Sequence, residues 1–145
     1  AFRALEAMYA GLVADTGCDD LLITSGYRTV ADQQGIWDRN LAQSGEDYTR
    51  SYVAIPGYRE HHTGLACDLS FYTDAGATIP LVDHEYGSWI WENCSDYGFI
   101  LRYPSDKVDI TGFDHEPWHF RYVGKEQAAL IKESGLCLEE YLAQE

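Results

Sequence analysis

The chain has 145 residues, of which 46% are apolar and 14% aromatic, and it carries a formal net charge of −14. This length and composition exclude a disordered chain and leave too little room for two comfortable domains, so we expect a single domain over residues 1–145. We also expect a monomer. With 24 acidic and 10 basic residues, the chain repels phosphate backbones and anionic headgroups, and we expect no nucleic-acid partner.

Hydrophobic periodicity predicts helices and strands in mixed order. In chain order we predict a helix, strand, helix, strand, helix, strand, strand and helix, at residues 2–16, 21–25, 30–43, 65–72, 87–98, 99–103, 118–123 and 125–134. No regular βαβ repeat joins these elements. The expected fold class is therefore α+β, with a small central antiparallel sheet flanked by helices.

Capping and turn residues indicate where the first elements begin and end. Gly17 is expected to stop the first helix, and Thr29 is a suitable N-cap for the second, which should end before Gly45. Segment 45–60 is predicted to be mostly loop, with one helical turn as an alternative within it, and segment 104–114 is predicted to be a loop. No apolar run approaches the length of a membrane span, so we expect none in this chain.

The four cysteines are widely spaced and never form Cys-x-x-Cys, which argues against a thiolate zinc knot and a thioredoxin-like site. Two disulfides or four free thiols both remain open. The sequence opens at AFRALEAMYAGL without a methionine, which is compatible with an excised domain whose anchor or export signal lies upstream. The cysteines are Cys18, Cys67, Cys94 and Cys137.

Residues 115–119 read HEPWH and match the His-Glu-x-x-His motif of zincins, which requires a helix. Pro117 inside the motif disfavours a helix, and the residues that follow alternate as in a strand. We therefore predict an extended segment in which His119 faces away from Trp118 and Phe120, with Glu116 nearby as a base for a metal held by His119.

A second metal-ligand pattern is EHHTGLACD, residues 60–68. In the predicted strand 65–72, Asp68 shares a face with Ala66 and can point at a metal, whereas Cys67 points to the other face as a small buried side chain. Periodicity does not decide whether His61 or His62 joins Asp68.

Together these motifs resemble a family of zinc peptidases. His61-x-x-Gly64-x-Ala66-x-Asp68, followed further along by Glu116-Pro117-Trp118-His119, is similar to the two-part signature of VanY-type D-alanyl-D-alanine carboxypeptidases. That family shares its fold with VanX dipeptidases, VanXY enzymes and the hedgehog amino-terminal domain. The similarity extends from about residue 20 to residue 124 and includes the segments SGYR (25–28), YGFILRYP (97–104) and DITGFDHEPWHFRYVG (109–124).

The resemblance implies Zn²⁺ held by His61, Asp68 and His119, with Glu116 as the catalytic base and His115 outside the ligand set. Three ligands with an open fourth position suit a catalytic zinc, which lowers the pKa of bound water towards ~7. Glu116 would take a proton from the attacking water and deliver it to the leaving amine.

The resemblance also suggests substrate contacts. Arg28 is the expected cation that stabilises the oxyanion. Gln33 matches a position that holds the substrate backbone, with an exposed helix residue as the alternative, and Ser25 is a further expected substrate contact. Arg59 stands where the family usually has serine, and it either pairs with the terminal carboxylate of the substrate or is a solvated loop charge.

These expectations describe a zinc D,D-carboxypeptidase that removes the C-terminal D-Ala from peptidoglycan stem peptides or precursors, with a role in glycopeptide resistance or wall remodelling. The alternatives are a D,D-dipeptidase or dual-activity enzyme, an L,D-carboxypeptidase, and a non-hydrolytic zinc-containing binding module. The expected location is extracytoplasmic, in the cell envelope and behind a membrane anchor, or cytoplasmic for the dual-activity type.

Overall fold

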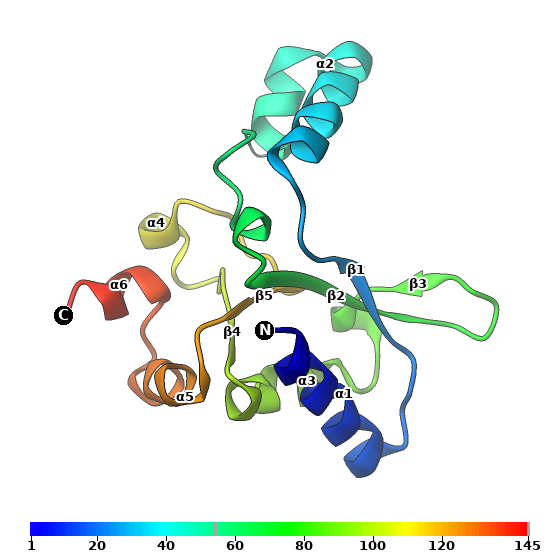
Figure 1. Ribbon diagram of the computed structural model, residues 1–145, viewed down its shortest axis with the longest axis vertical. Helices are drawn as coiled ribbons and strands as arrows, with labels where there is room; N and C mark the ends of the chain where they lie inside the picture. The colour runs from blue at the N-terminus through cyan, green and yellow to red at the C-terminus, as the bar shows by residue number, and fades with distance from the viewer. Residues whose placement is uncertain (54, 145) are drawn as a thin grey trace.

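The computed structural model describes residues 1–53 and 55–144 and is built around an antiparallel sheet (Figure 1). The strands β1 (Leu21–Ser25), β2 (Ala66–Tyr72), β5 (His119–Tyr122) and β4 (Phe99–Leu101) lie side by side in that order, and β3 (Thr78–Ile79) also pairs with β2. Every pair is antiparallel. The predicted α+β class with a small antiparallel sheet is confirmed.

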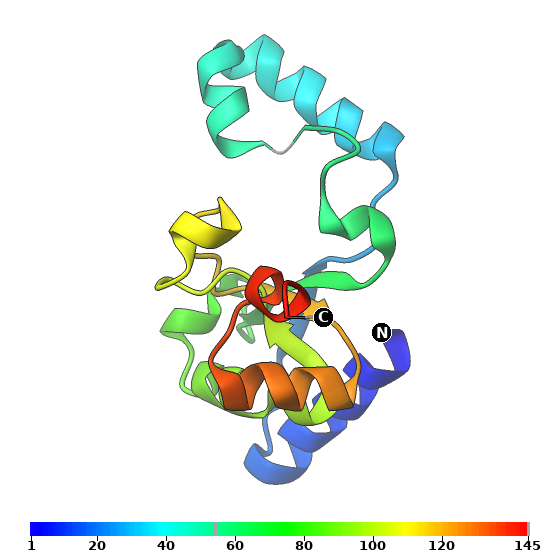
Figure 2. The same cartoon turned by 90° about the vertical axis from the view of Figure 1, so that its left-hand side faces the viewer.

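Helices surround the sheet, and α2 stands away from it, joined by the segments on either side (Figures 1 and 2). No helix within 1–53 and 55–144 has the length and apolar character that a bilayer crossing requires. The α-helices are α1 (Phe2–Thr16), α2 (Val30–Tyr52), α3 (Gly87–Asn93), α4 (Val108–Thr111), α5 (Lys125–Ser134) and α6 (Leu138–Leu142), and the 3-10 helices are η1 (Glu60–Thr63), η2 (Leu81–Asp83) and η3 (Cys94–Tyr97).

The main core lies between α1 and one face of the sheet. Cys67, Leu69 and Phe71 alternate along β2 and pack there with the apolar stripe of α1 and with Phe120 of β5. Because successive strand residues point to opposite faces, Asp68 projects away from this core. Cys67 is buried as expected, and all four cysteines are free thiols.

The start of α2 follows the sequence prediction, but its end does not. Thr29 caps the helix in a reciprocal capping box with Asp32. At Gly45 the backbone turns to a φ of 82°, which only glycine adopts easily, and helical structure then resumes as far as Tyr52. The loop predicted from residue 45 onward is therefore wrong up to residue 52, since the glycine interrupts the helix without ending it.

Short elements account for the other differences. The predicted loop 104–114 contains α4, and α6 follows α5 where no helix was predicted. Both have five residues or fewer, too few for hydrophobic periodicity to reveal them. The predicted helix 87–98 is divided between α3 and η3, and the strand predicted over 99–103 ends at Leu101.

Candidate active site

Three side chains from two parts of the chain meet at one end of the pairing between the central strands β2 and β5. His61 comes from η1, Asp68 lies on β2, and His119 is the first residue of β5, directly opposite Asp68. One ligand atom from each lies within 4.8 Å of the others. The strand that we predicted around His119 thus places it beside Asp68.

His61 is held with one ring nitrogen free. Its Nδ1 atom donates to the carbonyl oxygen of Gly26 at 2.8 Å, so a neutral ring carries a lone pair on Nε2. That Nε2 atom is buried and has no hydrogen-bond partner within the described residues. It lies 3.3 Å from Oδ2 of Asp68, which is also an acceptor.

In His119 the roles of the two ring nitrogens are exchanged, so that Nε2 faces an outer partner and Nδ1 faces Asp68. Its Nε2 atom lies 3.4 Å from Oε2 of Glu60, and its Nδ1 atom lies 2.9 Å from Oδ1 of Asp68. The ring also stacks on Tyr103 with centroids 5.1 Å apart. Burial disfavours the charged ring, but the hydrogen bonds to Asp68 and Glu60 outweigh it and raise the pKa of His119.

The donor set fits a divalent metal ion. If His61 and His119 keep their protons on the nitrogens that face Gly26 and Glu60, both remaining nitrogens present lone pairs to the carboxylate of Asp68. A cluster of acceptors in a buried position calls for a cation between them. Two imidazole nitrogens and one carboxylate, with outer partners fixing each ring, are a usual ligand set for catalytic zinc.

Asp68 is suited to this role because it stays ionised. Burial disfavours its charged form, yet the neighbouring rings of His119 and His61 outweigh burial and hold the pKa of Asp68 well below its usual range. Its side chain is only 13% exposed, so its negative charge is weakly screened.

Glu116 lies beside His119, just before the turn that leads into β5. Residues 115–118 are not helical, as predicted, and the indole N–H of Trp91 donates to the carbonyl of Pro117 at 2.9 Å and supports the turn. Oε2 of Glu116 is 3.7 Å from Nδ1 of His119. Burial raises the pKa of Glu116, against the opposing charges of His119 and Arg59, which brings this carboxyl closer to the range of a useful base.

Arg28 is anchored by two of the predicted substrate contacts. Its Nη1 atom donates to Oε1 of Gln33 at 2.8 Å, and its Nη2 atom donates to Oγ of Ser25 at 2.7 Å. Gln33 is 1% exposed, so the alternative of an exposed helix residue is wrong. The backbone N–H of Arg28 also donates to the carbonyl of His61 at 3.2 Å, which ties this arginine to the ligand turn.

Two pockets flank the three side chains. Arg59 lines one pocket together with Glu116 and His119, and its charge acts on Glu116 and on Arg28. Asp68 borders the other pocket, which is mainly apolar and includes the half-exposed Trp118. The other residues are Tyr58, Glu60, Tyr103 and Phe113 in the first pocket, and Thr24, Leu69, Ser70, Pro80, Leu81, Val82 and Pro117 in the second.

The neighbouring histidines are engaged elsewhere. His62 donates from Nδ1 to the carbonyl of Arg28 at 2.7 Å and accepts at Nε2 from the N–H of Gly57 at 3.2 Å. Both of its ring nitrogens are thus satisfied. Nδ1 of His115 donates to the carbonyl of Tyr103 at 2.8 Å.

Sequence reasoning missed Glu60, Arg102 and Tyr103. Glu60 accepts from Nε of Arg102 at 2.8 Å, and Arg102 is 8% exposed. Burial raises the pKa of Glu60, but hydrogen bonds from His119 and Arg102 outweigh it, and the pKa lies below its usual range. A carboxylate directly before a ligand histidine is a usable signal for such a partner, whereas nothing near Arg102 in the sequence indicates its contact.

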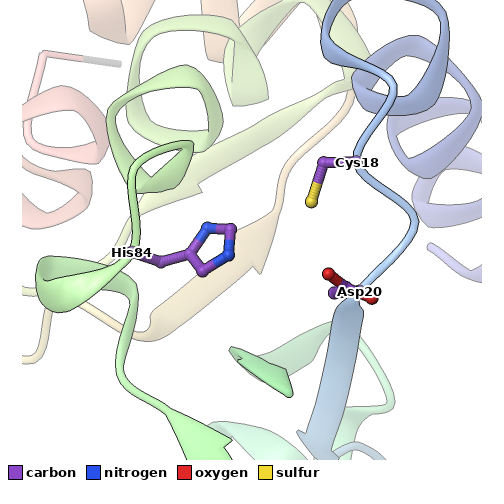
Figure 3. A group of neighbouring side chains, drawn as sticks. All are labelled: Cys18, Asp20 and His84. Atoms are coloured by element: carbon purple, nitrogen blue, oxygen red, sulfur yellow. The ribbon is translucent and has the colours of Figure 1, made fainter. Parts of the chain in front are cut away.

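A second group of potential ligands is less suited to a metal. Cys18, Asp20 and His84 converge at the other end of β1 (Figure 3). The N–H of Tyr86 donates to Nδ1 of His84 at 3.3 Å, so the neutral ring keeps its proton on Nε2. Burial raises the pKa of the Cys18 thiol and disfavours the thiolate that a metal requires.

Known proteins are similar to this chain over most of its length. The family described as "VanY: D-alanyl-D-alanine carboxypeptidase" matches residues 1–125. The chain is 44% identical over 130 residues to a D-alanyl-D-alanine carboxypeptidase of Enterococcus faecalis, covering 83% of this chain and 47% of that protein. It is 41% identical over 134 residues to the bifunctional D-Ala-D-Ala dipeptidase and carboxypeptidase VanXYC of Enterococcus gallinarum, covering 90% of this chain and 70% of that protein.

A solved structure agrees. The structure of VanYB in complex with D-alanine-D-alanine superposes with a TM-score of 0.80 at 40% identity, covering 99% of this chain and 80% of that one. The chain spans about half the length of the E. faecalis relative and a larger share of VanXYC and VanYB. Family match, sequence identity and fold agree, and the chain belongs to the VanY family of D-alanyl-D-alanine carboxypeptidases.

Proposed function

We propose that this chain is a zinc-dependent D,D-carboxypeptidase that removes the C-terminal D-Ala from peptidoglycan stem peptides or their precursors. The observation that carries the proposal is the buried group of His61, Asp68 and His119, whose ligand atoms converge around the unpartnered Nε2 atom of His61, with Glu116 beside it. Because the family acts on D-Ala-D-Ala peptides, a peptide ending in D-Ala is the proposed partner.

A zinc ion held by His61, Asp68 and His119 would supply Lewis acidity to the scissile carbonyl and to water. Glu116 would accept the proton of the attacking water and pass it to the leaving amine, since its carboxylate is close to the site and its pKa is raised by burial. Its lower acidity makes it a stronger base than a solvated glutamate.

Arg28 would stabilise the negative charge that develops on the carbonyl oxygen. Two hydrogen bonds, to Gln33 and Ser25, hold its guanidinium in one orientation, so little reorganisation is needed during the reaction. In this proposal, Gln33 and Ser25 act partly by orienting Arg28. The resemblance suggested only substrate contacts for Gln33 and Ser25, and their hydrogen bonds to Arg28 add this orienting role.

The decisive experiment incubates the zinc-loaded protein with a muramyl-type pentapeptide ending in D-Ala-D-Ala and follows D-alanine by mass spectrometry. We expect release from the pentapeptide and none after chelation. The matching tetrapeptide and free D-Ala-D-Ala test the L,D-carboxypeptidase and dipeptidase alternatives. A protein that holds one zinc per chain and releases D-alanine from none of them would be the non-hydrolytic binding module instead.

Arg59 offers a test of how the terminal carboxylate is recognised. It lines the pocket beside Glu116, and a charge-assisted bidentate pair contributes about 1.5–3 kcal/mol. For Arg59→Ala we therefore expect kcat/KM on the pentapeptide to fall by about 10- to 150-fold, mainly through KM. The control substrate is the same peptide with a C-terminal amide, which the parent and Arg59→Ala should treat alike. An equal loss on both peptides would show that Arg59 does not bind the carboxylate.

Dual dipeptidase and carboxypeptidase activity is the second candidate, favoured by the 41% identity to VanXYC. Turnover of free D-Ala-D-Ala at a rate similar to the pentapeptide would support it. It also bears on location, which we propose to be extracytoplasmic, in the cell envelope, for a carboxypeptidase and cytoplasmic for a dual enzyme. We further propose a monomer, which sedimentation analysis would test.

A further inference from the structure

A chain of buried charged groups leads from His119 to the C-terminal helix. Oε2 of Glu60 faces Nε2 of His119 at 3.4 Å, and Oε1 of Glu60 accepts from Nε of Arg102 at 2.8 Å. Both terminal nitrogens of Arg102 then donate to the two carboxylate oxygens of Glu139 on α6, at 2.9 and 2.5 Å. Three contacts thus connect His119 to a residue that lies outside the part of the chain matched by the family, residues 1–125.

These groups are poorly accessible to water. The side chains of His119, Arg102 and Glu60 are 3%, 9% and 17% exposed, and only Glu139, at 35%, reaches the surface. In such surroundings, a buried charge that loses its partner is strongly disfavoured, so the contacts hold each other in place. The two parallel bonds from Arg102 to Glu139 also fix the plane of the guanidinium.

The two oxygens of Glu60 have different neighbours. Oε1 faces two guanidinium groups, since Nη1 of Arg121 lies 3.3 Å away in addition to Nε of Arg102. Arginine only donates, so this position must hold an acceptor. Oε2 is left to accept the proton on Nε2 of His119, and it competes for that proton with Oδ1 of Asp68, which lies 2.9 Å from Nδ1. A metal ion between Asp68 and Nδ1 would remove this competition and leave the proton with Glu60.

We propose that Glu139 and Arg102 are positioning residues that act through Glu60 to set the tautomer of His119, so that α6 is part of the metal centre. This inference rests on the proposed metal site at His61, Asp68 and His119. Its substance is that a helix beyond the part of the chain matched by the family influences which nitrogen of His119 is free for a ligand bond.

Glu60→Gln gives a sharp expectation. The guanidinium groups will retain the carbonyl oxygen of the new amide at the Oε1 position, which turns its NH₂ group towards Nε2 of His119. His119 must then accept at Nε2 and carry its proton on Nδ1, the nitrogen that should bind the metal. We expect zinc affinity, measured by competition with a chelator, to fall about 10- to 100-fold.

Glu139→Gln tests the remote end, with Glu140→Gln as the matched control on the same helix. Glu140 pairs with Lys107 at 2.9 Å and accepts from the N–H of Cys137 at 2.9 Å, and both contacts lie outside the chain of groups that ends at His119. The amide oxygen of glutamine can still accept from Cys137. We expect Glu139→Gln to weaken zinc binding about 2- to 30-fold, Glu139→Asp to restore much of it, and Glu140→Gln to leave it unchanged.

The position of the proton on the His119 ring is a further readout, and general destabilisation of the fold would not change it. Nitrogen-15 NMR of the metal-free protein at alkaline pH should show a smaller fraction of His119 rings protonated on Nε2 in Glu60→Gln than in the parent, because Asp68 then holds the proton on Nδ1 without competition. Parent-like His119 signals in both Glu60→Gln and Glu139→Gln, with unchanged zinc affinity, would overturn the proposal. If Glu60→Gln does not fold, the Glu139 and Glu140 pair decides alone. A parent that binds no zinc would refute the proposed function, whereas the tautomer result would still judge this inference.

Discussion

His61→Ala is expected to abolish zinc binding and D-alanine release, whereas His62→Ala should retain both. The two residues are adjacent, but only His61 has a buried ring nitrogen without a hydrogen-bond partner in the described part of the chain, and it faces Asp68. Outer partners of metal ligands alone contribute 10- to 100-fold in affinity, so loss of a ligand should exceed about 100-fold. Both ring nitrogens of His62 are hydrogen-bonded to backbone groups, of Arg28 and Gly57.

Metal content per chain after dialysis, and the shift of the unfolding midpoint on adding zinc, measure the effect. A ligand at 100 times its Kd stabilises a folded protein by about 2.7 kcal/mol, so the parent and His62→Ala should gain thermal stability while His61→Ala should not. Equal zinc content in the two variants would place the metal elsewhere.

Glu116→Gln should lower kcat on the pentapeptide by about 10²- to 10⁴-fold and leave zinc binding in place, because the amide cannot accept the proton. Oε2 of Glu116 lies 3.7 Å from a ring nitrogen of His119, close enough to serve a water molecule at the site. Asp114→Asn, an exposed acidic residue two positions earlier, is the matched control and should retain parental kcat.

Stopped D-alanine assays at saturating peptide, with zinc content measured on the same samples, separate this effect from loss of metal. A Glu116→Gln variant with full zinc and undiminished kcat would mean that another group takes the proton. A variant that loses its zinc would instead indicate that Glu116 contributes to holding the metal.

The strands that carry Asp68 and His119 could be predicted from the sequence because alternation is a local property. Residues around Asp68 alternate between core and site, and Pro117 excludes the zincin helix that HEPWH suggests. The choice between His61 and His62 came from the family resemblance, because a 3-10 turn has no periodicity that distinguishes two adjacent side chains.

The supporting contacts could not be predicted in the same way. Glu60 and Arg102 are 42 positions apart, and Arg102 and Glu139 are 37 apart. Their pairing depends on how η1, the end of β4 and α6 come together, which no local pattern encodes. Similarly, a glutamine near the start of a helix is usually exposed. Gln33 is buried where α2 begins, and it accepts a hydrogen bond there from Arg28.

The pairing of Asp68 with His119 across β2 and β5 has a consequence for the order of assembly. These residues are 51 positions apart, and they become neighbours only when the two strands have formed the correct register. An unfolded chain therefore offers no preformed site, and loop closure over that distance must precede high-affinity capture of the ion. Scarcity of zinc should consequently yield folded but inactive molecules that later supply of the ion can switch on without refolding.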